Sequence, residues 1–196
     1  MGWGFFGICN FYSWRLLEEI RGFTPLGVSA QYTPALICGP LAAGASGFRL
    51  THTPVSFTIM VAIIALFLGQ LITVTQPAKQ IYWAQMFFVI VIVPLSEDVS
   101  LRAGTVIGST SMQHEHQGLA ASLIYTMVYY SISIALDITE DVEVHVKNHS
   151  ATPEDMMFGI RCAWCTGVIL AGCGVMLGAL YFGRTLLREG WRVRYH

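Results

Sequence analysis

Residues 94–136, PLSEDVSLRAGTVIGSTSMQHEHQGLAASLIYTMVYYSISIAL, decide the fold because they place charged side chains inside an otherwise apolar stretch. The apolar run Ile81–Val93 leads directly into them, and a second apolar run follows a short polar corner. Two long apolar runs joined in this way predict a hairpin of membrane-spanning helices. The charges inside the hairpin are Glu97, Asp98 and Arg102. Because charge is costly inside a bilayer, these residues are expected to line a pathway or a binding site.

The same cluster also has a plainer interpretation, a neutral ion pair. Asp98 and Arg102 are four residues apart, so they could neutralise each other on one helix face. An ion pair that faces lipid would still be costly, which favours the pathway. In a pathway, Glu97 or Asp98 would carry a proton, and Arg102 would tune it or hold an anionic group.

The composition of the whole chain indicates an integral membrane protein. Of its 196 residues, 54% are hydrophobic and only 12% are charged, whereas soluble domains carry about 25% charged residues. The net charge of −1 provides no basic field for a nucleic-acid partner. The five cysteines all lie in apolar segments, where they read as small hydrophobic side chains rather than a disulfide framework. The predicted class is therefore all-α and integral to the membrane.

Uncharged segments recur along the chain with the length that a bilayer requires, roughly 20 residues of helix. They predict a six-helix bundle that forms a single transmembrane domain over residues 1–196. The expected helices lie near residues 2–20, 26–47, 55–76, 81–111, 117–137 and 157–183.

The loops and the tail predict how this bundle is oriented. The tail, residues 184–196, carries four arginines against one acid, which marks the cytoplasmic side. Six spans then place the acidic segment 138–156 outside as an exoplasmic loop. That loop contains the sequon Asn148-His-Ser150, so Asn148 is a candidate glycosylation site.

Charges also cluster where the first predicted helix ends. Arg15 and Glu19 are four residues apart and can bridge on one helix face, with Glu18 beside them. The cluster is either an interfacial cap or the mouth of a pathway, and the sequence leaves both interpretations open. Arg15 and Glu18 are therefore included among the candidate pathway residues.

The remaining motifs do not predict enzyme chemistry. The pair Cys162 and Cys165 has CxxC spacing, but no second ligand pair or redox-type context accompanies it. His114 and His116 have no third ligand in view, and a polar turn between helices explains them better. Neither a phosphate-binding loop nor a catalytic constellation can be found. The prediction is a protein that is not an enzyme and uses no cofactor or metal.

Several short stretches carry a resemblance to a known family. Along nearly the whole chain, and in order, the sequence resembles the fungal fourteen-span drug:proton antiporter branch of the major facilitator superfamily. The stretches that carry the resemblance most clearly are Glu115-His-Gln-Gly-Leu-Ala-Ala-Ser122, Tyr130-Ser-Ile-Ser-Ile134, Val142-Glu-Val-His-Val146 and Tyr82-Trp-Ala-Gln85.

The resemblance implies that the six helices are the C-terminal half of a major facilitator fold, which needs two such halves. In that fold the first and fourth helices of a half line the central cavity, and the second and fifth face the other half. The substrate would then lie between the first, fourth and fifth helices, with Tyr125 and Tyr129 as aromatic walls.

The predicted function is transport of the major facilitator type. The expected activity is proton-coupled efflux of a small molecule, drug or secondary metabolite across the plasma membrane, by a larger or assembled transporter. The expected partners are the lipid bilayer, the small-molecule substrate, protons, and a missing N-terminal half or another membrane chain. The alternative is a truncated, transport-incompetent half that only associates with other membrane proteins.

Overall fold

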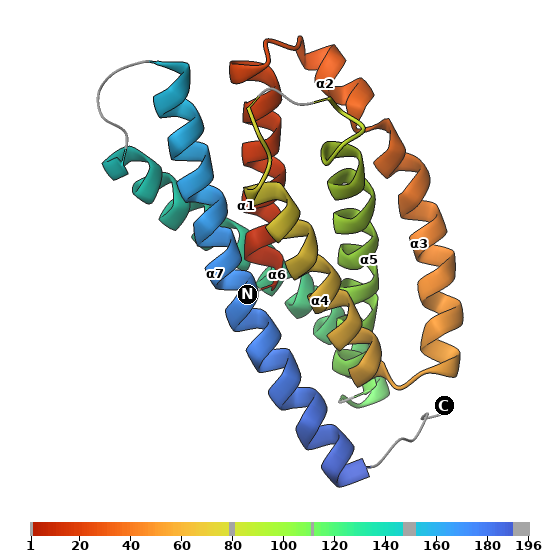
Figure 1. Ribbon diagram of the computed structural model, residues 1–196. Coiled ribbons are helices and arrows are strands. Elements are labelled where there is room, and N and C mark those ends of the chain that lie inside the picture. The colour runs from red at the N-terminus through yellow and green to blue at the C-terminus, as the bar shows by residue number, and fades with distance from the viewer. Residues whose placement is uncertain (1, 79–80, 111, 147–151, 190–196) are drawn as a thin grey trace.

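A computed structural model describes residues 2–78, 81–110, 112–146 and 152–189. Within these ranges the chain is helical and contains no strand, which confirms the predicted all-α class (Figure 1). The helices, in chain order, are α1 (Gly2–Arg15), the π-helical turn η1 (Leu16–Ile20), α2 (Pro25–Gln31), α3 (Thr33–His52), α4 (Val55–Val74), α5 (Met86–Thr110), the 3-10 turn η2 (His114–His116), α6 (Gln117–Val146) and α7 (Pro153–Glu189).

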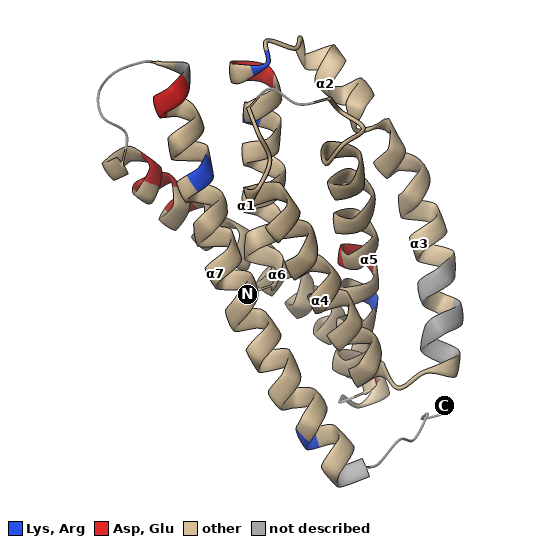
Figure 2. Ribbon diagram, in the orientation of Figure 1, with Lys and Arg blue, Asp and Glu red and all other residues tan. Residues whose placement is uncertain are grey.

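The apolar helices match the predicted membrane class. In the described part of the chain, the helical segments Val55–Val74, His114–Val146 and Glu154–Leu187 are long and apolar enough to cross a bilayer. Helix α5 has 25 residues and carries the three charges of the predicted pathway in its middle. Figure 2 shows charged residues gathered where α1 and α6 end and where α7 begins, and few charges along the rest of the bundle.

Helices α2 and α3 together form one bent element, where the sequence predicted a single helix over residues 26–47. Thr24 caps α2 by accepting a hydrogen bond from the Gly27 backbone N–H at 3.3 Å, and Pro25 occupies the first turn. Tyr32 separates the two helices, and Pro34 lies in the first turn of α3, where its missing N–H costs no helical hydrogen bond.

The ends of three other predicted helices also differ from the observed ones. Helix α5 begins at Met86 rather than at residue 81, because residues 82–85 form turns. Helix α6 continues to Val146, so nine residues of the predicted exoplasmic loop, 138–146, are helical. The extension has a physical cause, since Thr139 and Glu143 in it are buried. Helix α7 begins at residue 153 and continues through Glu189, into the predicted tail.

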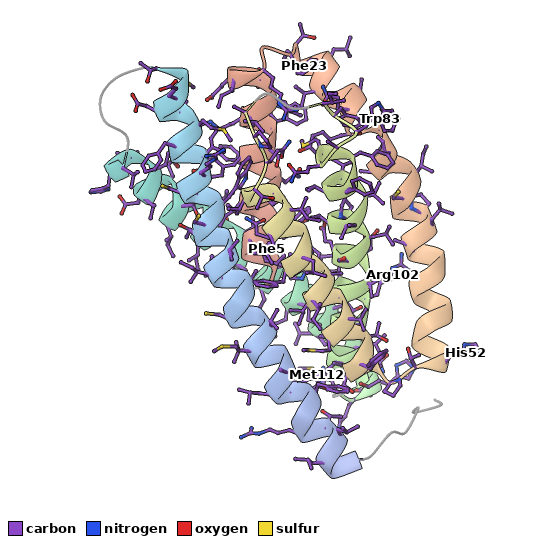
Figure 3. All side chains as sticks on the ribbon, viewed as in Figure 1. Phe5, Phe23, His52, Trp83, Arg102 and Met112 are labelled. Atoms are coloured by element: carbon purple, nitrogen blue, oxygen red, sulfur yellow. The ribbon has the colours of Figure 1, made fainter. Side chains whose placement is uncertain are left out.

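Helix α1 lies in the middle of the bundle and packs against α6 and α7 (Figure 1). Ile8 and Tyr12 of α1 and Leu16 of η1 are at most 1% exposed and form one core cluster with Trp164 of α7. Phe5 lies in a second core cluster, with side chains of α4 and α5, in the interior of the bundle (Figure 3). This burial fixes the face that α1 turns toward α5.

Helices α3 and α6 each leave an apolar side uncovered. In Figure 1, α3 runs along one edge of the bundle and α7 along the opposite edge. Large apolar side chains of α3 and α6 are 49–74% exposed: Leu36, Ile37, Leu41, Leu119, Leu123, Met127 and Ile134. Exposed apolar surface of this extent indicates contact with lipid or with another protein.

Candidate functional site

The candidate site is a cavity of about 150 Å³ between α1, the start of α3 and α5. Most of its lining is apolar, as in typical small-ligand sites. Its chemistry comes from a few polar groups, which are Cys9, Asn10, Ser13, Tyr32 and Glu97. We call it the mid-bundle cavity, because Asn10 and Glu97 both lie near the middle of their helices.

Helical periodicity explains why these side chains reach the cavity. On α5 the lining residues Met86, Ile90, Val93 and Glu97 are three or four apart, so they share one face. On α1 the lining residues Phe6, Cys9, Asn10 and Ser13 share a face for the same reason. The two faces meet across the cavity, with Tyr32 and Ala35 lining a further side.

Glu97 is the acidic residue of the mid-bundle cavity. Its side chain is partly buried, and no ion pair involves it among the residues that the structure describes. An intramembrane carboxyl group without a cation partner is costly and marks a functional site by default. Such a group can bind a proton and release it.

Asp98 and Arg102 lie against α3 rather than in the cavity. A Cβ atom built on Gly39 would stand 3.8 Å from Asp98 Oδ2. Arg102 donates a hydrogen bond from Nη1 to the Ala43 carbonyl oxygen at 3.2 Å (Figure 3). In the described part of the chain no ion pair joins Asp98 to Arg102. The plainer interpretation of the cluster, mutual neutralisation, is therefore not what this structure contains.

Arg15 belongs to an ion-pair network where α1 ends. Its Nη1 donates to both carboxylate oxygens of Glu143 at 3.0 and 2.8 Å, and its Nε and Nη2 donate to Glu19 at 3.0 Å. The Glu143 side chain is only 4% exposed. Buried ion pairs hold only with good geometry, and this pair has it. Arg15 thus joins the end of α1 to α6 and does not reach the mid-bundle cavity.

Glu143 is a residue that the sequence prediction missed, because it was assigned to a loop. A signal was available in the periodicity of α6. Val128, Ala135, Thr139 and Glu143 are four or seven residues apart and all are buried, so the inward face of α6 continues beyond the predicted helix end.

The other candidate pathway residues lie on the outside of the bundle. Glu18 is exposed and accepts a hydrogen bond from Trp14 Nε1 at 3.2 Å. Tyr125 and Tyr129 are 45% and 66% exposed on the uncovered side of α6. The structure therefore places Glu97 in the cavity and distributes the other predicted residues over three separate surfaces. Asn148 lies outside the described residues.

A second, larger cavity of about 580 Å³ lies between the beginning of α3 and the beginning of α5. It is lined by apolar and aromatic side chains that include Pro34, Ile37, Trp83 and Phe87, of which Trp83 is labelled in Figure 3. The Tyr82 hydroxyl closes one side by donating to the Gln31 carbonyl oxygen at 2.6 Å. Its lining offers little polar chemistry, unlike that of the mid-bundle cavity.

In the described ranges, no three His, Cys, Asp or Glu side chains are grouped closely enough to hold a metal ion. Cys162 and Cys165 are free thiols.

Known proteins with sequences similar to this chain are named as transporters or efflux pumps. No protein-family model matches the chain. It is 44% identical over 192 residues to the low affinity ammonium transporter of Saccharomyces cerevisiae, which covers 98% of this chain and 37% of that protein. It is 35% identical over 176 residues to the efflux pump terJ of Aspergillus terreus, which covers 90% of this chain and 33% of the pump.

A further relative carries the family name itself. The major facilitator superfamily multidrug transporter mdr3 of Aspergillus fumigatus is 32% identical over 149 residues, covering 76% of this chain and 26% of that protein. The chain spans about a third of the length of the curated relatives that it matches most extensively. The predicted resemblance is thus confirmed, and the chain belongs to the major facilitator superfamily of membrane transporters.

Proposed function

We propose that this chain is the C-terminal half of a proton-coupled exporter of a small molecule in the plasma membrane, and that Glu97 carries the proton. The observation that carries the proposal is the position of Glu97 in the mid-bundle cavity, facing α1 across it. Substrate and coupling-ion sites of such transporters lie near the midplane, at the interface of structural repeats.

The uncovered sides of α3 and α6 support the presence of a second half. Leu41 of α3 and Met127 of α6 are 67% and 61% exposed. A partner bundle with complementary apolar helices would cover such surfaces and close the cavity from the other side. Tyr125 and Tyr129 lie on this uncovered side and would then line the boundary with that partner.

The names of the relatives suggest two probes for the experiment. One relative is named for low affinity ammonium transport, and another, 30% identical over 193 residues, is the aminotriazole resistance protein of Saccharomyces cerevisiae. The test uses the protein at its native length in yeast cells that lack their own aminotriazole exporters. Retention of radiolabelled aminotriazole and of the ammonium analogue methylammonium is measured with and without a protonophore.

We expect Glu97→Gln to abolish protonophore-sensitive transport of whichever probe is carried, because glutamine keeps the shape of the side chain but cannot bind the proton. Asp98→Asn is the matched control. Asp98 is the next residue in the chain, but its carboxyl group lies toward α3 rather than in the cavity. Most of the transport should therefore remain. Unchanged transport in the Glu97→Gln variant would refute the assignment of Glu97.

A second candidate function is a half-protein that only associates with other membrane chains. The uncovered apolar side of α6 favours it equally well. Blotting native membranes with an antibody to residues 184–196 separates the two functions. A band more than twice the 21.6 kDa of this chain supports the exporter, whereas a band near that mass supports the associating half.

A further inference from the structure

Ser13 is an unusual residue on the α1 face of the mid-bundle cavity. It is only 2% exposed, and among the residues that the structure describes its hydroxyl oxygen makes no well-formed hydrogen bond, with only the Cys9 thiol beside it. Its polar neighbour, the Cys9 thiol, is a weak partner that also contacts Thr73 Oγ1 at 3.5 Å. An unpaired buried hydroxyl group is costly and requires an explanation.

Two other buried hydroxyl groups, those of Ser96 on α5 and Thr139 on α6, are satisfied within their own helix. Ser96 donates to the Ile92 carbonyl oxygen at 2.8 Å, and Thr139 donates to the Ala135 carbonyl oxygen at 2.6 Å. Ser13 has the same option one turn back on α1 but does not use it. Its hydroxyl group is free for a ligand in the cavity that it lines.

The cavity has the size and the polar groups that water requires. Its volume of about 150 Å³ leaves room for a few water molecules, since each takes roughly 30 Å³ in the liquid and makes two to four hydrogen bonds. Asn10 offers an amide, Ser13 a hydroxyl and Glu97 a carboxyl group. Asn10 is also exposed, so the cavity has a polar mouth.

We infer that the mid-bundle cavity is a binding site for water, which Asn10 and Ser13 hold against Glu97. The inference rests on the proposed function, because it supplies the route by which the proton of Glu97 enters and leaves. Asn10 and Ser13 are positioning residues for that proton.

The proton step is balanced without any further reactant. The O–H bond of the protonated Glu97 carboxyl group breaks as a new O–H bond forms on the adjacent water, leaving a carboxylate and a hydronium ion. The amide oxygen of Asn10 and the hydroxyl oxygen of Ser13 accept hydrogen bonds from that ion. The reverse transfer restores the carboxyl group.

The test measures how readily a reagent dissolved in water reaches position 13, without a transport substrate. In the native-length protein in membranes, Ser13→Cys is treated with a water-soluble methanethiosulfonate reagent, and mass spectrometry locates the labelled cysteine. The reagent reacts with thiolates, and a thiol buried in apolar surroundings stays inert. Ser96→Cys is the matched control, because Ser96 is 6% exposed, bonds within its own helix and does not line the cavity.

We expect Ser13→Cys to label at least about tenfold faster than Ser96→Cys. A thiol pKa that is lower by one unit raises the reactive thiolate fraction about tenfold. Asn10→Cys, at the exposed mouth, should label fastest. Equal and slow labelling of Ser13→Cys and Ser96→Cys would overturn the inference. Failure of Asn10→Cys to label would overturn it as well, since the mouth would then not meet water.

A transport measurement separates this inference from the proposed function. Ser13→Ala should slow protonophore-sensitive export of the carried probe without lowering the amount of folded protein, because it removes only an unpaired hydroxyl group. Ser96→Ala should leave export unchanged. If Glu97→Gln stops export and Ser13→Ala does not slow it, the water site is wrong. If Glu97→Gln has no effect, the proposed function fails, while the labelling result still decides whether the cavity holds water.

Discussion

At the scale of single residues, a buried ion pair between Arg15 and Glu143 joins α1 to α6. Two hydrogen bonds of 3.0 and 2.8 Å join one guanidinium nitrogen to both carboxylate oxygens, with the Glu143 side chain 4% exposed. The aromatic rings of Phe11 and Tyr12 lie within 6.0 Å of the same guanidinium group and screen it from water.

We expect Glu143→Gln to lower the free energy of unfolding by about 3 kcal/mol, the lower end of the range for breaking a buried ion pair, because Glu19 still pairs with Arg15. Thermal unfolding of the protein in detergent measures the loss. Asp141→Asn is the matched control, with an exposed carboxyl group on the same helix, and should change the stability by less than about 0.5 kcal/mol.

The exchanged pair, Arg15→Glu with Glu143→Arg, should recover part of the stability that either single change removes. Glu19 would then lie beside a new glutamate, so full recovery is not expected. If Glu143→Gln lowered the free energy of unfolding no more than Asp141→Asn does, the ion-pair network would not stabilise the fold.

The sequence located Glu97 but neither Glu143 nor Ser13, for physical reasons. An acidic residue in an apolar run is visible because its cost depends on the bilayer alone. The burial of Glu143 depends on α1, more than a hundred residues away in the chain, and the unpaired state of Ser13 depends on the cavity beside it. Spacing along α6 could mark Glu143 as inward-facing, but it shows neither the arginine of α1 that pairs with Glu143 nor the cavity beside Ser13.

At the scale of helices, the close crossing of α1 and α6 fixes the orientation of the cavity face of α1. A Cβ atom on Gly4 would lie 2.7 Å from Ala135 Cβ and 2.9 Å from the Ser131 carbonyl oxygen. On Gly7 it would lie 2.6 Å from a methyl carbon of Ile132. Small residues allow helix backbones to approach this closely inside a membrane.

Gly4→Ala should therefore destabilise the bundle by about 1–3 kcal/mol, the usual cost of overpacking a tight contact. Gly104→Ala is the control, since nothing lies within 4 Å of the position of its added Cβ atom. It should be neutral or stabilising by up to about 1 kcal/mol, because alanine favours a helix more than glycine does. Equal melting temperatures for both variants would mean that α1 and α6 do not pack this closely.

The predicted helices correspond to the observed ones in order, and their ends differ for reasons outside each helix. Apolar length alone located the spans. It could not show that α6 continues to Val146, since the extra turns are largely polar and only Thr139 and Glu143 in them are buried, Glu143 against Arg15. Apolar length also could not show the break at Tyr32, which separates the Thr24-capped helix α2 from α3, the helix that contains Pro34 and Pro40.

At the scale of the whole molecule, the bundle combines a cavity that holds a few polar groups with apolar sides that no described residue covers. The core surrounds α1, whereas α3 and α6 expose large apolar side chains. This division accords with one half of a two-half transporter, in which the cavity face and the uncovered faces meet the second half. The central claim is that Glu97 is the residue through which such a transporter couples to protons.

The most direct measurement of that claim is the proton flux that accompanies the carried probe in sealed vesicles containing the native-length protein. We predict that Glu97→Gln exchanges labelled probe for unlabelled probe across the membrane, because substrate contacts remain, but moves no protons with it. Asp98→Asn should keep both activities. If Glu97→Gln vesicles moved as many protons per probe molecule as the unchanged protein, the account of Glu97 as the proton carrier would be contradicted.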